Sequence, residues 1–272
     1  MKKSRILLIT LALGLILSAC VKEQALPDLP PSQSMVLEVD NIWVQSPVAE
    51  AFKTGIPQSN FVFAAANVYW WNIVLTVQMV VPVAAYLESF NHDPVWDRSA
   101  LAWVWSYSVP VNNTTYTAEL FAETKNDEIH WSMYISKEDG FTDLLWFTGT
   151  SRNDNSSGTW IIHKDPNSAV KDPAESIPFL EIIWTANDTG ITDIKYTNIE
   201  DNSQENGSYI QFGKADDPVY DAYYDIFRVW QENLVSIKWN STTHEGRVLS
   251  MEHFLDPYWH CWDEFFQNIA CE

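Results

Sequence analysis

The sequence predicts a mainly β protein in which a large antiparallel meander curls into a barrel or half-barrel around an N-terminal buried helical segment. From about Leu101 onward, apolar and polar residues alternate with the period of two that is typical of strands with one buried face, as in residues 128–136. Short polar clusters such as Asp139-Gly140 separate about ten such runs, which is the pattern of consecutive hairpins. Before these runs, residues 54–87 carry no charge, and residues 60–87 of this stretch are the expected filler of the concave side. A sheet this wide leaves two free edges unless it curls or closes.

The first 20 residues have the three zones of a secretory signal. Lys2, Lys3 and Arg5 form a basic start, and residues 6–17 form a nearly unbroken apolar run that is too short to span a membrane comfortably. The segment ends in residues 17–20, Leu-Ser-Ala-Cys, where small residues precede the cysteine. The chain is therefore expected to be exported.

Residues 17–20 resemble the lipobox of bacterial lipoproteins, whose cysteine receives the lipid. The resemblance implies that residues 1–19 are a lipoprotein signal peptide and that Cys20 attaches the protein to a membrane of the cell envelope. An ordinary signal peptide and a short anchor helix are the alternatives. Val21 and Lys22 follow the cysteine, where an aspartate retains enterobacterial lipoproteins in the inner membrane, so the outer membrane is the expected location.

The rest of the chain is expected to be a tether followed by one domain. Residues 20–35 contain three prolines and no periodicity, and this composition predicts an extended, solvated tether after the lipidated cysteine. Residues 36–272 are then a single β-meander domain with a helical insert at about residues 60–90, a length that suits one large domain.

The uncharged segment allows three interpretations. The favoured one is a helix that begins at Ser59 or Asn60 as its N-cap and is buried on nearly all sides. The β-branched run at residues 73–77 leaves a buried strand as the alternative for the later half. Residues 61–86 are also long and apolar enough for a transmembrane helix, although amide side chains within the segment and Pro82 oppose that reading.

Composition excludes some partners. The formal net charge is −20, which repels the phosphates of nucleic acid, so no nucleic-acid role is expected. The excess of acidic residues is interpreted as a means of keeping the protein soluble. Binding of divalent cations by acidic loops is the alternative. The chain is 46% hydrophobic and has 14 Trp, 11 Tyr and 13 Phe, enough for a sizeable core. Exposed tryptophans that stack on sugars are the alternative use of these rings.

The three cysteines have two expected roles, lipid attachment for one and disulfide formation for the other two. With Cys20 used by the lipid, Cys261 and Cys271 remain together in an exported compartment, where a disulfide is the candidate pairing. Two free thiols are the alternative, because Cys271 is the penultimate residue.

The residues that could carry chemistry are scattered, and no catalytic residue, metal or cofactor is predicted. His130 and His163 lie on predicted strands, on the outward polar face. His253 and His260, with Glu252 as an oxygen ligand, are the only metal hypothesis, and their spacing matches no zinc signature. Residues 153–158 come nearest to a calcium loop, but one carboxylate is too few, and a hairpin turn is favoured.

The strand pattern resembles two groups of proteins. One is the periplasmic lipoprotein-carrier fold, an incomplete barrel whose helices cap an apolar cavity. The other is a set of secreted lipoproteins whose meanders repeat phrases such as residues 147–150, Phe-Thr-Gly-Thr, and 157–160, Ser-Gly-Thr-Trp. The resemblance carries no catalytic residue to this chain.

Together these features predict a lipid-anchored, non-catalytic envelope lipoprotein that holds an apolar ligand, or a partner's acyl chain, within the curved sheet. One alternative is a structural or interaction lipoprotein with a filled core, whose partner is another envelope protein. Another is a surface protein that binds carbohydrate. An empty apolar cavity favours the carrier, a solid core the interaction protein, and a row of exposed tryptophans the carbohydrate binder.

Overall fold

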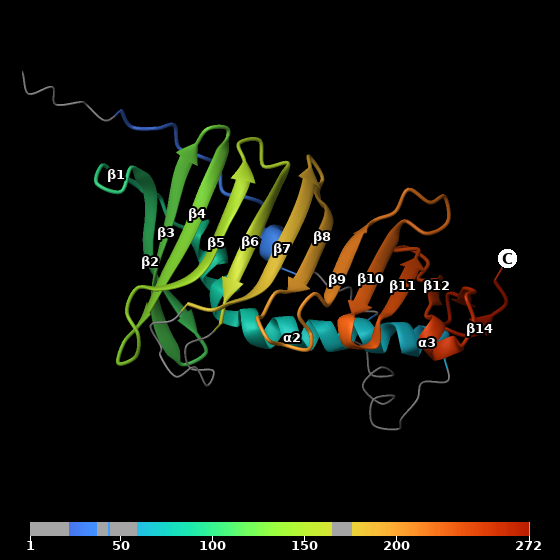
Figure 1. The fold of residues 1–272 in the computed structure, drawn as a ribbon. Coiled ribbons are helices and arrows are strands. Elements are labelled where there is room, and N and C mark those ends of the chain that lie inside the picture. Colours follow the sequence, from blue (N-terminus) through green and yellow to red (C-terminus); the bar gives the residue numbers. More distant parts are fainter. Residues whose placement is uncertain (1–21, 37–42, 44–58, 165–175, 272) are drawn as a thin grey trace, which may run out of the picture.

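The protein is one open antiparallel sheet crossed by a long helix (Figure 1). The computed structural model describes residues 22–36, 43, 59–164 and 176–271. The predicted signal peptide and Cys20 lie outside these described residues. Fourteen strands follow one another in chain order across the sheet, and each pairs with the next in antiparallel register. The predicted meander is therefore confirmed.

The elements have the following bounds. The strands are β1 (Val95–Asp97), β2 (Ala102–Val111), β3 (Thr114–Lys125), β4 (Glu128–Lys137), β5 (Leu144–Arg152), β6 (Ser157–His163), β7 (Pro178–Asn187), β8 (Gly190–Asn198), β9 (Tyr209–Lys214), β10 (Ala222–Arg228), β11 (Asn233–Trp239), β12 (Gly246–Leu249), β13 (His260–Trp262) and β14 (Asn268–Ile269). The helices are η1 (Ser32–Met35), α2 (Asn60–Ser89), η3 (Val229–Gln231) and α3 (Met251–Phe254).

The sheet is not closed into a barrel. Strands β1 and β14 are its two edges, and they do not pair with each other in the described part of the chain. Both edges are short, three residues in β1 and two in β14, so they offer few unpaired backbone groups to another strand. A sheet can protect its edges either by closing into a barrel or by ending in short strands. This protein does the second, and the sequence pattern does not distinguish the two arrangements.

Tryptophans on the buried face pack over glycines of the neighbouring strands. Gly149 pairs with Trp160 on one side, and Gly158 pairs with Trp184. A Cβ atom at Gly149 would lie 2.2 Å from Cε3 of Trp160, and one at Gly158 would lie 2.5 Å from Cζ2 of Trp184. The repeated Thr-Gly and Ser-Gly phrases of the sequence thus provide the space for large indole rings.

From Asn60 onward the uncharged segment is one continuous helix, so the strand alternative for residues 73–77 is wrong. Ser59 is the N-cap residue with extended backbone, although its side chain makes no capping hydrogen bond. α2 packs on the buried face of the sheet, where the Tyr107 hydroxyl donates to the Ala85 carbonyl at 2.6 Å. Its sheet-facing side chains are buried, namely Ala64, Ala65, Val68, Trp71, Leu75, Met79, Val81, Ala85 and Tyr86.

The proline-rich segment lies against the domain instead of standing free in solvent, and residues 32–35 of the predicted tether form the short helix η1. The side chain of Gln24 accepts a hydrogen bond from the Thr124 amide and donates one to the Thr124 carbonyl, at 3.1 and 3.2 Å. Farther along, the buried Tyr86 hydroxyl donates to the Pro30 carbonyl at 2.6 Å. The backbone carbonyl groups of such a proline-rich segment remain available to accept hydrogen bonds from side chains of the sheet and the helix. The folded unit therefore begins by Gln24, not at residue 36.

Candidate functional site

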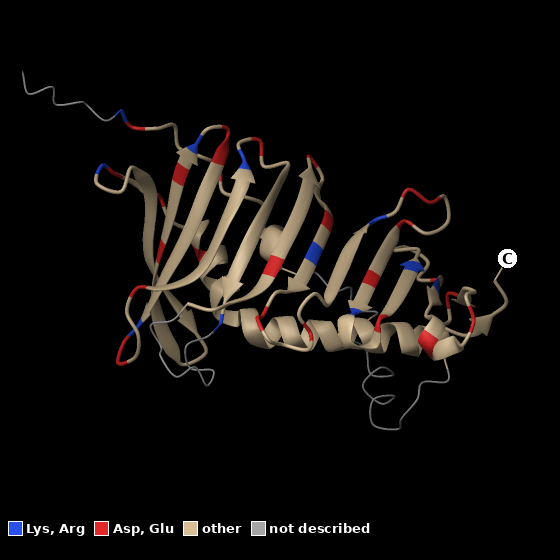
Figure 2. Ribbon diagram, viewed as in Figure 1, with Lys and Arg blue, Asp and Glu red and all other residues tan. Residues whose placement is uncertain are grey.

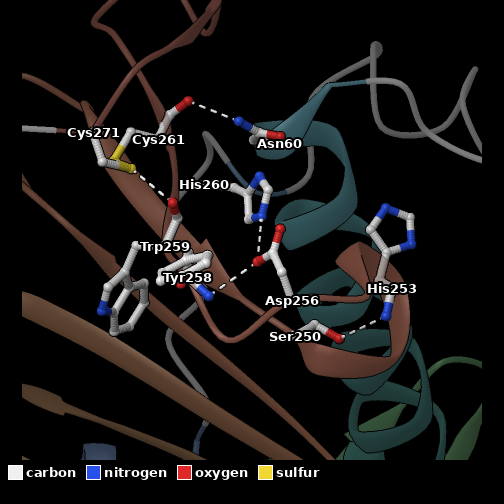
Figure 3. A network of polar contacts seen from close by, with 9 residues as sticks. All are labelled: Asn60, Ser250, His253, Asp256, Tyr258, Trp259, His260, Cys261 and Cys271. Atoms are coloured by element: carbon white, nitrogen blue, oxygen red, sulfur yellow. Dashed lines mark hydrogen bonds and ion pairs between the residues drawn. A yellow bond between two sulfur atoms is a disulfide. The ribbon is translucent and has the colours of Figure 1, made fainter.

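The C-terminal segment is fastened to the start of α2 (Figure 3). The Asn60 side chain donates to the Cys261 carbonyl at 2.8 Å, and the Asn60 backbone N–H donates to the side-chain oxygen of Asn268 at 2.8 Å. Cys261 and Cys271 form a disulfide with a Cα–Cα distance of 5.3 Å. This network joins the last strands to the helix and is a structural clamp.

We expect the disulfide to contribute about 2–3 kcal/mol to the free energy of unfolding, because it closes a short loop in the unfolded chain. The exposed Cys271 can be replaced without disturbing the core, so Cys271→Ala should lower the urea midpoint by the corresponding amount. Reducing agent should lower the midpoint of the natural protein equally and have no further effect on the variant. Equal midpoints for both proteins without reductant would contradict the prediction.

The histidines near the C-terminus do not form a metal site. Nε2 of His260 lies 3.1 Å from the Asp256 carboxylate, while the His260 ring stacks on Phe254 at 3.7 Å (Figure 3). The His253 ring stacks on Phe63 of α2 at 3.8 Å. Among the described residues, no three His, Cys, Asp or Glu side chains converge in a group that could hold a metal ion. The stacked rings explain these residues as packing, His253 between α3 and α2 and His260 between β13 and α3.

The loop at residues 153–158 is a hairpin turn. Asp154 accepts hydrogen bonds from the backbone amide and hydroxyl of Ser156, at 3.0 and 2.6 Å, and these bonds hold the pKa of its carboxyl below the usual value. The carboxylate is thereby occupied within the turn, and Asn155 takes the left-handed conformation that such a turn needs.

His163 is buried, so its expected place on the outward polar face is wrong. The pairing of β6 with β7 shifts register here, because Ile162 pairs with Leu180 and His163 pairs with Pro178, so Phe179 of β7 is the extra residue. Nδ1 of His163 lies 3.1 Å from the Leu145 carbonyl. Burial lowers the pKa of this imidazole because desolvation disfavours its charged form.

We expect His163 to make stability depend on pH below its unfolded pKa. The unfolded chain takes up a proton near pH 6.5 while the folded protein resists it, so the free energy of unfolding falls as the pH is lowered from about 7 to 5. His163→Asn, which keeps a donor for Leu145, should flatten this slope in urea titrations. His130→Asn on the opposite face of the sheet is the matched control, and an unchanged slope in His163→Asn would refute the assignment.

Large side chains fill most of the buried face of the sheet, and a pocket of about 290 Å³ remains between α2 and β7, with Trp71, Leu75, Phe179 and Leu180 in its lining. The largest fully buried side chains include Trp43, Trp131, Trp146, Trp160, Trp184 and Trp262. Burial raises the pKa of the Tyr86 and Tyr107 hydroxyls, so both remain neutral donors inside the core. The structure therefore favours the filled-core alternative over a ligand held inside the sheet.

The exposed tryptophans do not form a row suited to a sugar chain. Only Trp70 and Trp230 are among the exposed large apolar side chains of the described residues, and they lie on different elements, α2 and η3. The guanidinium of Arg228 lies over the Trp70 ring, 5.0 Å from its centroid. The carbohydrate alternative thus gains no support from the arrangement of these rings.

The face of α2 that points away from the sheet is apolar and exposed, which corrects the expectation of a helix buried on nearly all sides. Only 39% of its most apolar 18-residue stretch is buried. The large side chains exposed along it are Trp70, Ile73, Val77, Val80 and Leu87, between 36% and 67% exposed. A soluble helix on a sheet ordinarily carries charged residues at such positions.

The exposed side chains of α2 follow a regular spacing. With Ala84 included, residues 70, 73, 77, 80, 84 and 87 are separated alternately by three and four positions. This is the a and d pattern of a helix that packs against another helix. The spacing is visible in the sequence, but apolarity alone predicts burial for these positions as well as for the core positions of the helix.

An apolar groove runs beside the exposed face. Met35 and Val36 lie on one side of it, and the side chains of α2 from Asn72 to Leu87 lie on the other. Its volume is about 350 Å³, and most of its lining is aliphatic. The groove and the exposed face form one continuous apolar surface, and we treat the face of residues 70–87 as the candidate functional site.

This surface can bind apolar groups but supplies no reacting group. Between Trp70 and Leu87 the polar side chains outside the core are Asn72, Thr76 and Gln78, which are neutral amides and a hydroxyl, while Tyr86 is buried. Comparison of the chain with protein-family models, with curated proteins and with solved structures gives no match in any of the three. The candidate function therefore rests on the geometry and on the sequence.

Proposed function

We propose that this protein is a lipid-anchored, non-catalytic protein of the bacterial cell envelope, placed at the outer membrane, that acts by docking an apolar helical partner on the exposed face of α2. The observation that carries the proposal is the a and d spacing of apolar side chains from Trp70 to Leu87, all of which are exposed except the half-buried Ala84. Leaving this surface in water costs free energy that a partner helix would recover.

The lipid would hold one end of the strands close to the bilayer. Gln24 is fixed beside Thr124 at the end of β3, and only residues 21–23 separate it from Cys20. Four peptide steps extend over about 14 Å at most, so the turn between β3 and β4 would face the membrane. Figure 1 places α2 along the opposite ends of the strands, so the exposed face would stand away from the bilayer surface.

The charge distribution supports docking through α2. Acidic side chains gather at the turns between strands, whereas the helix carries no charge before Glu88 (Figure 2). A chain of net charge −20 is repelled by anionic lipids and by acidic proteins over most of its surface. The exposed face of α2 is an extended area where this repulsion is smallest.

A second candidate function is suggested by the groove beside Met35. Its volume of about 350 Å³ and its aliphatic lining suit a single acyl chain, with the sheet curved as a half-barrel behind α2. Native mass spectrometry of the intact protein released from membranes tests it. A co-purifying lipid that is lost in Val83→Glu, a groove variant, favours this function, and its absence counts against it.

The docking function is tested by a photoreactive amino acid in place of Val77 in the intact protein in cells. A matched probe replaces Val95, which is as exposed, 72% against 67%, but lies on the edge strand β1. We expect irradiation to join position 77 to a protein and to leave position 95 unreacted. Adducts with lipid alone, or none at either position, would refute docking.

A further inference from the structure

We propose that the partner helix is α2 of a second copy of this chain, packed antiparallel in a two-fold symmetric dimer. This inference rests on the proposed function, because it names the occupant of the same surface. It is carried by the pattern of burial around the helix, by charge, and by the position of the anchor.

The burial pattern shows that α2 has two separate apolar faces. Val68, Leu75 and Ser89 lie opposite the exposed positions in the seven-residue repeat, and all three are buried against the sheet. The exposed face from Trp70 to Leu87 thus points away from these buried positions. A second apolar stripe of this spacing suits contact with a second helix.

The exposed face is complementary to itself. In an antiparallel pair centred between Val77 and Val80, each of these valines meets the other in the second copy. The next layer pairs Ile73 with Ala84, a large residue with a small one, and the outermost layer pairs Trp70 with Leu87. Each a position therefore meets a d position, as a symmetric two-fold contact requires.

Charge favours a second copy over most other partners. Two chains that each carry −20 repel one another except through an uncharged surface, and residues 54–87 contain no charged residue. The flanking positions Tyr69, Val74, Thr76 and Val83 are uncharged as well, and the charges lie at the two ends of the face, at Glu88 beside Leu87 and at Arg228 over the Trp70 ring. No charged partner is selected by this surface, whereas an identical neutral surface fits it.

The anchor determines the direction of pairing. α2 runs across the strands, and the end of β3 that holds Gln24 lies away from it (Figure 1). If two helices paired parallel, the two-fold axis would follow the helix and would direct the two anchors to opposite sides. In an antiparallel pair the axis is perpendicular to α2, and both Cys20 residues reach the same bilayer.

The contact between the two helices is small, and attachment of both copies to one membrane compensates for the weak binding that a small contact gives. Eighteen helical residues extend over about 27 Å, which gives an interface at the low end of the range for specific complexes. Tethering of both copies to one bilayer raises their effective concentration, so a weak contact suffices.

Two full-length copies with different affinity tags, co-expressed and purified through one tag after mild solubilisation, test the proposal. We expect the second tag to be recovered, and we expect Val77→Glu in both copies to reduce this recovery at least tenfold, because each copy would bury a carboxylate without a partner against Val80 of the other copy. Val95→Glu, at the equally exposed edge-strand position, should leave recovery unchanged. Unchanged thermal unfolding of both variants shows that they fold.

A charge pair provides the test of direction. Co-expression of a Val77→Glu copy with a Val80→Lys copy should restore recovery, because these positions face each other only in the antiparallel arrangement. Absence of co-recovery in the natural protein, or recovery insensitive to Val77→Glu, would overturn the dimer. A different protein bound at position 77 would overturn the dimer but leave the docking function standing, whereas lipid or the chain's own residues 37–58 on this face would overturn both.

Discussion

The Cys20→Ala variant is expected to move the protein from the membrane fraction to the soluble fraction of the envelope. In the described residues, α2 is the only helix long and apolar enough to cross a membrane, and its sheet-facing side is packed in the core. Loss of the lipid would therefore leave an acidic domain with no other anchor. Fractionation of cells that express the natural chain and the variant measures the change, which should be nearly complete.

The mass of the variant distinguishes the outcomes. In Cys20→Ala, Ser18 and the new alanine occupy the small-residue positions of an ordinary cleavage site, so residues up to 20 should still be removed. A full-length precursor that stays in the membrane means only that cleavage failed, and a chain with a standard cleavable signal then replaces it. A correctly cleaved chain that remains in the membrane would contradict lipid anchoring and support a transmembrane helix at residues 61–86.

Gly158→Ala is expected to destabilise the fold by about 3 kcal/mol, at the upper end of the usual cost of overpacking. The added methyl group would lie 2.5 Å from both the Thr150 carbonyl oxygen and the ring of Trp184. Trp184 is fully buried between neighbouring strands, so it has no space into which to move. Urea unfolding followed by tryptophan fluorescence measures the loss.

Gly140→Ala is the matched control for this substitution. Its methyl group would meet only the flexible side chain of Lys137, at 3.2 Å, and the backbone of Gly140 is not in the left-handed region. We expect a change within about 0.5 kcal/mol. Similar losses of unfolding free energy in both variants would show that glycine is needed at position 158 for its backbone conformation and not to make room for the ring of Trp184.

Much of the fold could be predicted because its signals are local. The alternation of residues such as Trp131 and Met133 with polar neighbours depends only on which face of a strand is buried, and the structure has these strands in chain order. The long helix follows from the length and lack of charge of residues 54–87. Barrel closure is different, because it depends on whether the first and last strands meet, and neither strand encodes its distance from the other.

The candidate site was less predictable than the fold. Sequence spacing contained the pattern of Trp70, Ile73, Val77, Val80 and Leu87, but an apolar residue on a helix is equally compatible with burial and exposure. The sheet covers only one side of α2. Whether the other side is exposed depends on how many elements pack around the helix. Similarly, the prolines of residues 27–31 predicted an extended segment, but only the positions of Tyr86 and Thr124 show that it is packed on the domain.

The sequence by itself determined the succession of strands and turns, the single long helix, and the expectation of export and lipid attachment at Cys20. These features depend on neighbouring residues, whose periodicity and order are visible in the chain. The tertiary structure decided that the sheet stays open, that residues 24–36 belong to the folded unit, that His163 is buried, and that α2 exposes an apolar face. Each of these depends on which distant segments occupy the same space, and residue spacing does not record that.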